Sequence, residues 1–115
     1  MNKVSATLIL DTMKSWIEER QPISPHQWLD ASAKLNILRG DIDAELYEIE
    51  HYLAVKKADM MVEENMTHAR AETFIKAQPE YKELRLKQSK IKQIEEFIRI
   101  AKKQASLVNE EYKNS

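Results

Sequence analysis

The chain has 115 residues and no cysteine, with 18 Lys and Arg against 19 Asp and Glu, giving a formal net charge of −1. This length favours a single domain that spans residues 1–115. A single glycine and three prolines leave little material for tight turns, which excludes most all-β folds and predicts an all-α protein.

The first predicted helix covers about residues 5–20. Six residues, all apolar except Thr12, recur at intervals of four, which places them on one side of a helix: Leu8, Thr12, Trp16 and Ile9, Met13, Ile17. Pro22 ends the helix because proline lacks an amide hydrogen. The uncharged stretch from Val4 to Leu10 is too short for a membrane span, so no membrane partner is expected.

A second, long helix is predicted over about residues 25–77. Ser24 is a good N-cap, and Pro25 suits the first helical position. A coiled-coil-like series of apolar residues follows: Trp28, Leu35, Ile42 and Ile49 at intervals of seven, with Leu38, Leu46 and Leu53 between them. Gly40 interrupts this series. Two interpretations stay open, a tolerated glycine where helices approach closely and a break in the helix.

The third predicted helix covers about residues 79–111, after the boundary at Gln78-Pro79. Its apolar residues follow the most regular heptad pattern of the chain. Packed against the second helix, it would form a long antiparallel hairpin, with the short N-terminal helix at one end. Such a thin hairpin cannot bury every apolar residue, so we expect a homo-oligomer whose interface consists of Leu84, Ile91, Ile94, Phe97, Ile98, Ala101 and Ala105.

Charge is divided between the two long helices. Residues 27–65 contain nine acidic and four basic residues, whereas residues 66–107 contain ten basic and five acidic ones. One interpretation is that the acidic and basic arms attract each other within the hairpin. The other is a nucleic-acid face that binds phosphates. We assign to that face Lys82, Arg85, Lys87, Lys90, Lys92, Arg99, Lys102 and Lys103.

Aromatic and acidic residues give weaker signals. Tyr81 is predicted either to cap the hairpin core or to stack on a base. Glu48 and His51 form a single E-x-x-H pair, whereas helical di-iron sites need two such pairs and further glutamates. No phosphate-binding loop, dinucleotide motif or zinc-protease motif occurs. The sequence therefore predicts no enzyme activity, no catalytic residue, no metal site and no cofactor.

The layout resembles the UvsY-type recombination mediators of bacterial viruses. The likeness covers about residues 27–105 and rests on Trp28-Leu29, on the stretch from Ile42 to Lys57, and on the lysine-containing segment from Glu80 to Lys103. Members of that family form rings, bind single-stranded DNA and help to load a recombinase onto strands coated by single-strand-binding protein. The resemblance implies the same properties and partners here.

Together, these observations predict an oligomeric, cytoplasmic phage protein that binds single-stranded DNA in recombination or replication. The alternative is a coiled-coil adaptor, a phage assembly factor or an inhibitor that binds another protein and no nucleic acid.

Overall fold

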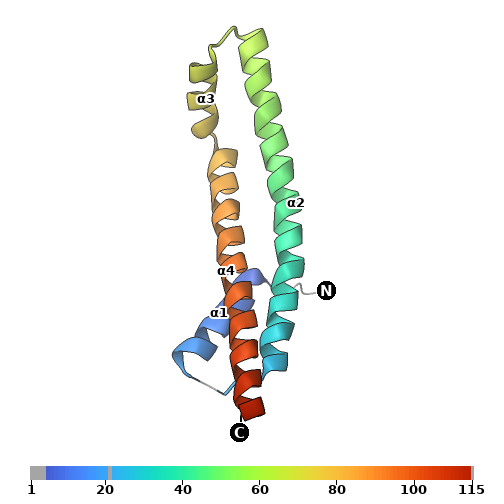
Figure 1. The fold of residues 1–115 in the computed structure, drawn as a ribbon. Coiled ribbons are helices and arrows are strands. Elements are labelled where there is room, and N and C mark those ends of the chain that lie inside the picture. The colour runs from blue at the N-terminus through green and yellow to red at the C-terminus, as the bar shows by residue number, and fades with distance from the viewer. Residues whose placement is uncertain (1–4, 21, 115) are drawn as a thin grey trace. The chain divides into compact units, whose positions relative to one another are not determined.

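The computed structural model describes residues 5–20 and 22–114, with side chains placed through residue 107. This part of the chain forms four helices and no strand (Figure 1): α1 (Ala6–Glu18), α2 (Pro25–Glu63), α3 (His68–Lys76) and α4 (Pro79–Asn114). The prediction of an all-α hairpin with a short N-terminal helix is confirmed. The oligomer stays a prediction.

Local hydrogen bonds fix where the first two helices begin. Ser5 Oγ accepts the Leu8 N–H at 3.1 Å at the start of α1. At the start of α2, Ser24 Oγ accepts the Gln27 N–H at 3.2 Å, while Gln27 Oε1 accepts the Ser24 N–H at 3.0 Å. This reciprocal arrangement is a capping box, and it confirms Ser24 as the N-cap.

Gly40 lies inside α2, which continues through it without a break. Apart from Gly40 itself, its two chain neighbours and the nearby backbone of its own helix, a Cβ atom added at Gly40 would have no atom within 4 Å, and the residue has no positive φ. A close approach between helices therefore does not explain the glycine. The helix is unbroken, so the interpretation of Gly40 as a tolerated glycine is correct and the predicted break is absent. The reason given for it, a close approach of another helix, was wrong.

The prediction of one unbroken helix over residues 25–77 was also wrong. α2 ends at Glu63, and α3 begins at His68 after a short turn. Asn65 has φ 54°, a left-handed conformation that asparagine tolerates better than most residues. Thr67 then caps α3, because its Oγ1 accepts the Arg70 N–H at 3.3 Å. High helical propensity obscured this turn.

The chain divides into two compact units, each of which contains part of α2 and part of α4. That the chain is a single domain stays a prediction. Unit 1 comprises Met1–Gly40 and Lys92–Ser115. Its described part packs α1, the first part of α2 and the last part of α4 around four large, fully buried side chains: Leu10, Met13, Leu35 and Ile94. Trp16 and Trp28 meet edge to face with ring centroids 5.0 Å apart.

Unit 2 comprises Asp41–Ile91. It packs the rest of α2 against α3 and the start of α4, which run in the opposite direction (Figure 1). Its core is Leu53, Met60, Ile75 and Leu84, with Leu46, Ile49, Met66 and Tyr81 against it. Lys87 Nζ donates to Glu45 Oε2 at 2.6 Å, which joins α4 to α2 beside this core.

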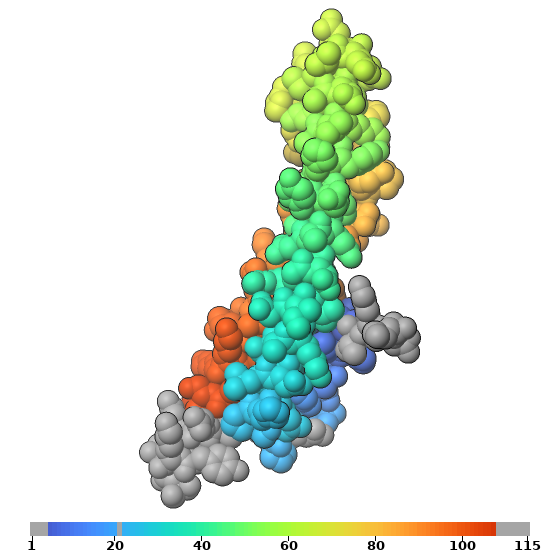
Figure 2. Space-filling model, turned by 90° about the vertical axis from the view of Figure 1, so that its right-hand side faces the viewer, coloured from blue at the N-terminus to red at the C-terminus, as the bar shows by residue number. Residues whose placement is uncertain are grey.

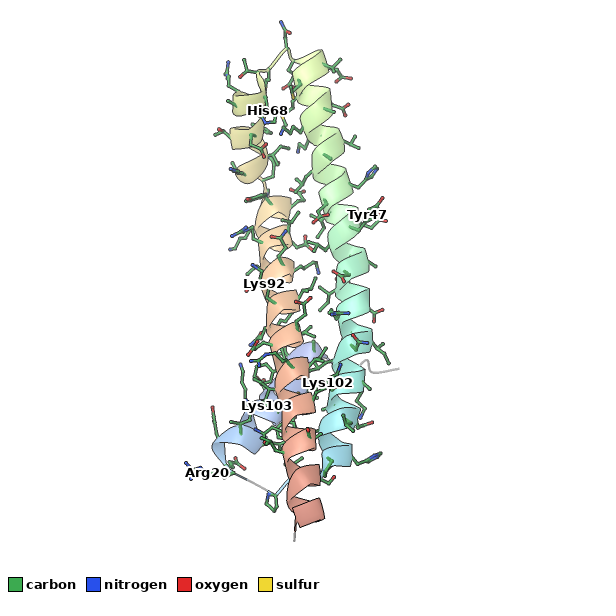
Figure 3. The ribbon with its side chains drawn as sticks, viewed as in Figure 1. Arg20, Tyr47, His68, Lys92, Lys102 and Lys103 are labelled. Atoms are coloured by element: carbon green, nitrogen blue, oxygen red, sulfur yellow. The ribbon has the colours of Figure 1, made fainter. Side chains whose placement is uncertain are left out.

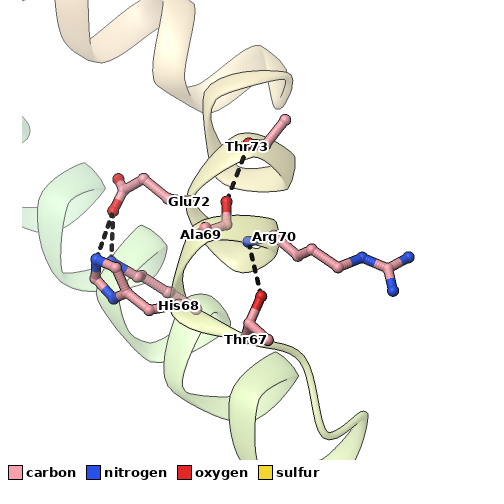
Figure 4. A network of polar contacts seen from close by, with 7 residues as sticks. Thr67, His68, Ala69, Arg70, Glu72 and Thr73 are labelled. Carbon is pink, nitrogen blue, oxygen red and sulfur yellow. Dashed lines mark hydrogen bonds and ion pairs between the residues drawn. The ribbon is translucent and has the colours of Figure 1, made fainter.

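A polar network holds α3 against α2 (Figure 4). Lys57 Nζ donates to Glu72 Oε2 at 2.5 Å, and His68 Nε2 lies 3.7 Å from the same oxygen. The hydrogen bond and positive charge of Lys57, with smaller effects of His68 and Lys76, lower the pKa of Glu72 below the 4.5 usual for glutamate. The ionised carboxylate therefore contributes to stability.

We predict that Gly40→Ala stabilises the protein by about 0.5–1 kcal/mol, because alanine restricts the unfolded chain and favours a helix interior. Urea denaturation measures this free energy of unfolding. Gly40→Pro is the opposite control and should cost about 3 kcal/mol or more. A loss of stability in Gly40→Ala would contradict the continuous helix.

The Glu72 network predicts a pH dependence. A carboxyl group whose pKa is lower in the folded than in the unfolded protein stabilises the folded state at a pH above its unfolded pKa. This stabilisation is lost as the pH falls through the pKa of the folded state. We therefore expect Glu72→Gln to be less stable than the wild type at about pH 7, and the difference to shrink over the acid range as the pH falls through the lowered pKa of Glu72. Urea denaturation across this range measures it. Glu63→Gln, at an exposed position, should show no such trend.

Candidate nucleic-acid interface

The basic residues predicted to bind phosphates all lie on α4, but they face different directions. In unit 1, Lys92, Arg99 and Lys103 follow one another at intervals of seven and four residues. These intervals place them on one side of the helix. Lys102 lies about 100° further around the helix, on the side of α4 that faces α2 (Figure 3).

Lys102 lines a groove between α2 and α4 of unit 1, with a volume of about 290 Å³. Arg39 Nη1 lies 3.7 Å from Glu95 Oε1 across this groove. Asn36 adds an amide, and Ile98 provides an apolar wall. The volume is at the lower end for ligand sites, so it suits a group the size of one base or phosphate rather than a large cofactor.

Three of the eight predicted residues already interact within the chain. Lys87 lies 2.6 Å from Glu45 and 3.9 Å from Glu83. Lys90 is half-buried and also interacts with other groups of the chain. Arg99 donates to Glu96 one turn away, and this pair raises the pKa of Arg99 and lowers that of Glu96. Because the Arg99–Glu96 pair is exposed, it adds little to stability.

The other five side chains are exposed, and none forms an ion pair with any residue whose side chain the structure describes: Lys82, Arg85, Lys92, Lys102 and Lys103. Attraction between acidic residues of α2 and basic residues of α4 therefore explains the presence of Lys87, which pairs with Glu45. It does not explain the other five basic residues. They are the part of the predicted basic surface that remains open to a ligand.

Tyr81 lies in the hairpin core. It is half-buried and packs against Leu53, Met60, Ile75 and Leu84 in unit 2. Of its two predicted roles, the structure therefore places it in the one that caps the core.

The residues predicted as the oligomer interface lie mostly inside the chain's own core. Leu84, Ile91, Ile94, Ala101 and Ala105 are buried, whereas Phe97 and Ile98 are half-buried. Lys14 Nζ lies 6.0 Å from the centre of the Phe97 ring, at the limit for a cation–π contact. These positions leave little surface for a second chain, and the interface assignment stays a prediction.

The acidic and histidine side chains that the structure describes do not come together in a metal site. Glu48 and His51 are both exposed on α2. Within residues 5–20 and 22–107, no three His, Asp or Glu side chains are grouped in a way that could hold a metal ion. Arg39 and Asn36 are among the groove residues that the sequence did not single out, because the spacing along α2 alone does not show which residues of α4 lie opposite.

Comparisons with protein-family models, curated proteins and solved structures gave no match to this chain. The resemblance to UvsY-type mediators therefore stays a prediction. Over the residues that the structure describes, none of the helices is both long and apolar enough to cross a membrane.

The burial of Ile94 predicts that Ile94→Ala costs about 2–5 kcal/mol of unfolding free energy, because it leaves a cavity in the core of unit 1. Leu86→Ala is the matched control. Leu86 is 61% exposed on the same helix, so we expect a change within about 0.5 kcal/mol. Equal, small effects of the two substitutions in urea denaturation would contradict the burial of Ile94 within one chain.

Proposed function

We propose that the protein is a non-enzymatic accessory factor of phage recombination or replication that binds single-stranded DNA through α4. The observation that carries this proposal is the set of exposed Lys and Arg side chains on α4 without an ion-pair partner among the described residues. A cytoplasmic location and contacts with a recombinase or a single-strand-binding protein belong to the same proposal, and they rest on the sequence resemblance.

Electrostatics supports a phosphate ligand. Lys92 and Lys103 lie on one side of α4, so a strand following the helix could contact both. Lys102 lies next to that side of α4 and lines the groove together with Arg39 and Asn36. These side chains carry hydrogen-bond donors for one base or one further phosphate. Neutralised phosphates release counterions, which favours binding at low salt even though the chain is almost neutral.

Exposed apolar side chains favour a second candidate function, that of a protein-binding adaptor. Among the residues whose side chains the structure describes, twelve large apolar ones are exposed, including Ile37, Tyr47, Val62 and Leu86. Exposed apolar surface is typical of contact with other proteins. A stoichiometric protein partner whose binding survives nuclease treatment would favour this candidate.

The DNA-binding proposal predicts a steep salt dependence. If four phosphates are neutralised, affinity for a single strand should fall about 50-fold between about 50 and 200 mM salt. Fluorescence anisotropy of a labelled oligothymidine measures this change. Lys92→Glu with Lys103→Glu should abolish most of the binding, because two contacts are lost and two repulsive charges are added.

The control is a second pair of reversals, Lys34→Glu with Arg70→Glu. It changes the net charge equally, but it lies on α2 and α3 at exposed positions. If both pairs weakened binding equally, only overall charge would matter and the assignment to α4 would be wrong. Absence of binding by the wild type at the lower salt concentration would overturn the proposal itself, and tighter binding to a duplex of equal length would overturn its preference for single strands.

A further inference from the structure

α2 carries a second heptad pattern on the side that faces away from the core of unit 2. Its residues alternate at intervals of three and four, as the a and d positions of a coiled coil do: Ala44, Tyr47, His51, Ala54, Ala58 and Met61. All six are exposed, whereas Leu46, Leu53 and Met60 of the same helix pack into the core. We call these six residues the outer seam.

The outer seam is an uncovered apolar surface within unit 2. Tyr47 is 65% exposed and points away from α4 (Figure 3). Val55 and Val62, beside the seam, are 46% and 82% exposed. Figure 2 shows this part of α2 at the front, with no other helix in front of it. A helix with two apolar sides is expected to pack against two partners, and the core supplies only one of them.

Side-chain size points to a second copy of α2 as the other partner. In an antiparallel pair with its two-fold axis between Tyr52 and Leu53, each large seam residue lies opposite a small one. Tyr47 meets Ala58 of the second copy, His51 meets Ala54, and Met61 meets Ala44. Alternation of large and small residues across facing positions is what allows two helices to interdigitate without voids.

A parallel pair would not show this complementarity. Each seam residue would then lie opposite its own copy, so that tyrosine meets tyrosine and histidine meets histidine while the alanine positions leave gaps. We therefore regard the antiparallel register as the one that the residue sizes specify.

Charges beside the seam favour the same orientation. Asp41, Asp43, Glu48 and Glu50 flank its first half, whereas Val55, Lys57, Val62 and Glu64 flank its second half. A parallel pair places Asp43 beside Glu48 of the other copy. The antiparallel pair instead places Glu50 beside Lys57 and sets Glu48 against Val55, with Asp43 near Glu64 only at the exposed ends. The charges beside the first half of the seam thus fit those beside the second half of another copy better than they fit those beside its first half.

We propose that two copies of this chain associate as an antiparallel pair of α2 helices through the outer seam. The contact is isologous, because the same surface of each copy contacts the other, and it therefore closes as a dimer. The seam extends for only about 26 Å along the helix, so we expect a weak dimer that dissociates on dilution. The inference does not depend on nucleic-acid binding.

Sedimentation equilibrium of the full chain at low and high micromolar concentration tests the association. We expect the average mass to rise from that of a monomer toward that of a dimer. Ala58→Glu should raise the dissociation constant at least tenfold, because it places a charge against Tyr47 of the second copy. Ser89→Glu adds the same charge at an exposed position of α4 and should leave the dissociation constant unchanged.

Cysteine cross-linking tests the register, since the natural chain has no cysteine. Chains carrying Tyr47→Cys and Ala58→Cys are mixed and oxidised in glutathione buffer, and mass spectrometry identifies the products. We expect the mixed 47–58 disulfide to dominate over both 47–47 and 58–58. Asp59→Cys, exposed on the same helix, replaces Ala58→Cys in the control and should give little mixed product.

Three results would overturn the proposal. A monomer at every concentration would exclude the dimer. A dimer that Ala58→Glu does not weaken would place the contact elsewhere. Dominant 47–47 and 58–58 disulfides would show a parallel pair. All these substitutions lie at exposed helical positions, and circular dichroism checks that each variant keeps the wild-type helix content.

Discussion

Burial of apolar side chains between antiparallel helices is the constraint on which the structure depends. α2 has 39 residues and α4 has 36, and packing of their apolar sides contributes more to their stability than helix propensity does. Each unit therefore has its own core, around Leu35 and Ile94 in unit 1 and around Leu53 and Leu84 in unit 2. A core that is one layer of side chains thick leaves the opposite sides of α2 and α4 in solvent.

Position relative to that core decides which charged residues are already paired. Lys87 lies three residues after Leu84 and four before Ile91, so it occupies a place within the heptad pattern of α4. Its side chain is half-buried, and Glu45 compensates for part of its desolvation. Lys92 and Lys103 lie away from the core, where water solvates them and no partner is required. The heptad pattern thus separates structural lysines from those that remain available to a ligand.

Much of the fold could be predicted because local signals and heptad spacing agreed. The N-cap at Ser24, the boundary at Pro79 and the burial of Ile91 and Ile94 all follow from residue type and spacing. The turn after Glu63 was missed, although Asn65 and Thr67 together are a recognisable signal of a left-handed residue followed by an N-cap. The prediction gave more weight to the helix propensity of the residues on either side.

The candidate site was less predictable, because it depends on the register between helices. The sequence identified the basic residues of α4, but not that Lys102 shares a groove with Arg39 and Asn36 of α2. Lys87 could have been excluded from the phosphate face by its heptad position alone. Which glutamate of α2 neutralises it depends on the packing of the two helices, and the spacing of residues along one helix does not contain that information.

Within unit 2, the outer seam and the exposed basic residues of α4 do not compete for space. In unit 2, the outer seam lies on the side of α2 away from the core, whereas Lys82 and Arg85 are exposed on α4. An antiparallel dimer would therefore keep both copies of these basic residues open to solvent. Two linked basic faces bind one strand more tightly than either face alone, because the second contact becomes intramolecular once the first has formed. A chain with a net charge of −1 could in this way bind DNA through doubling of a modest basic surface, without an excess of positive charge.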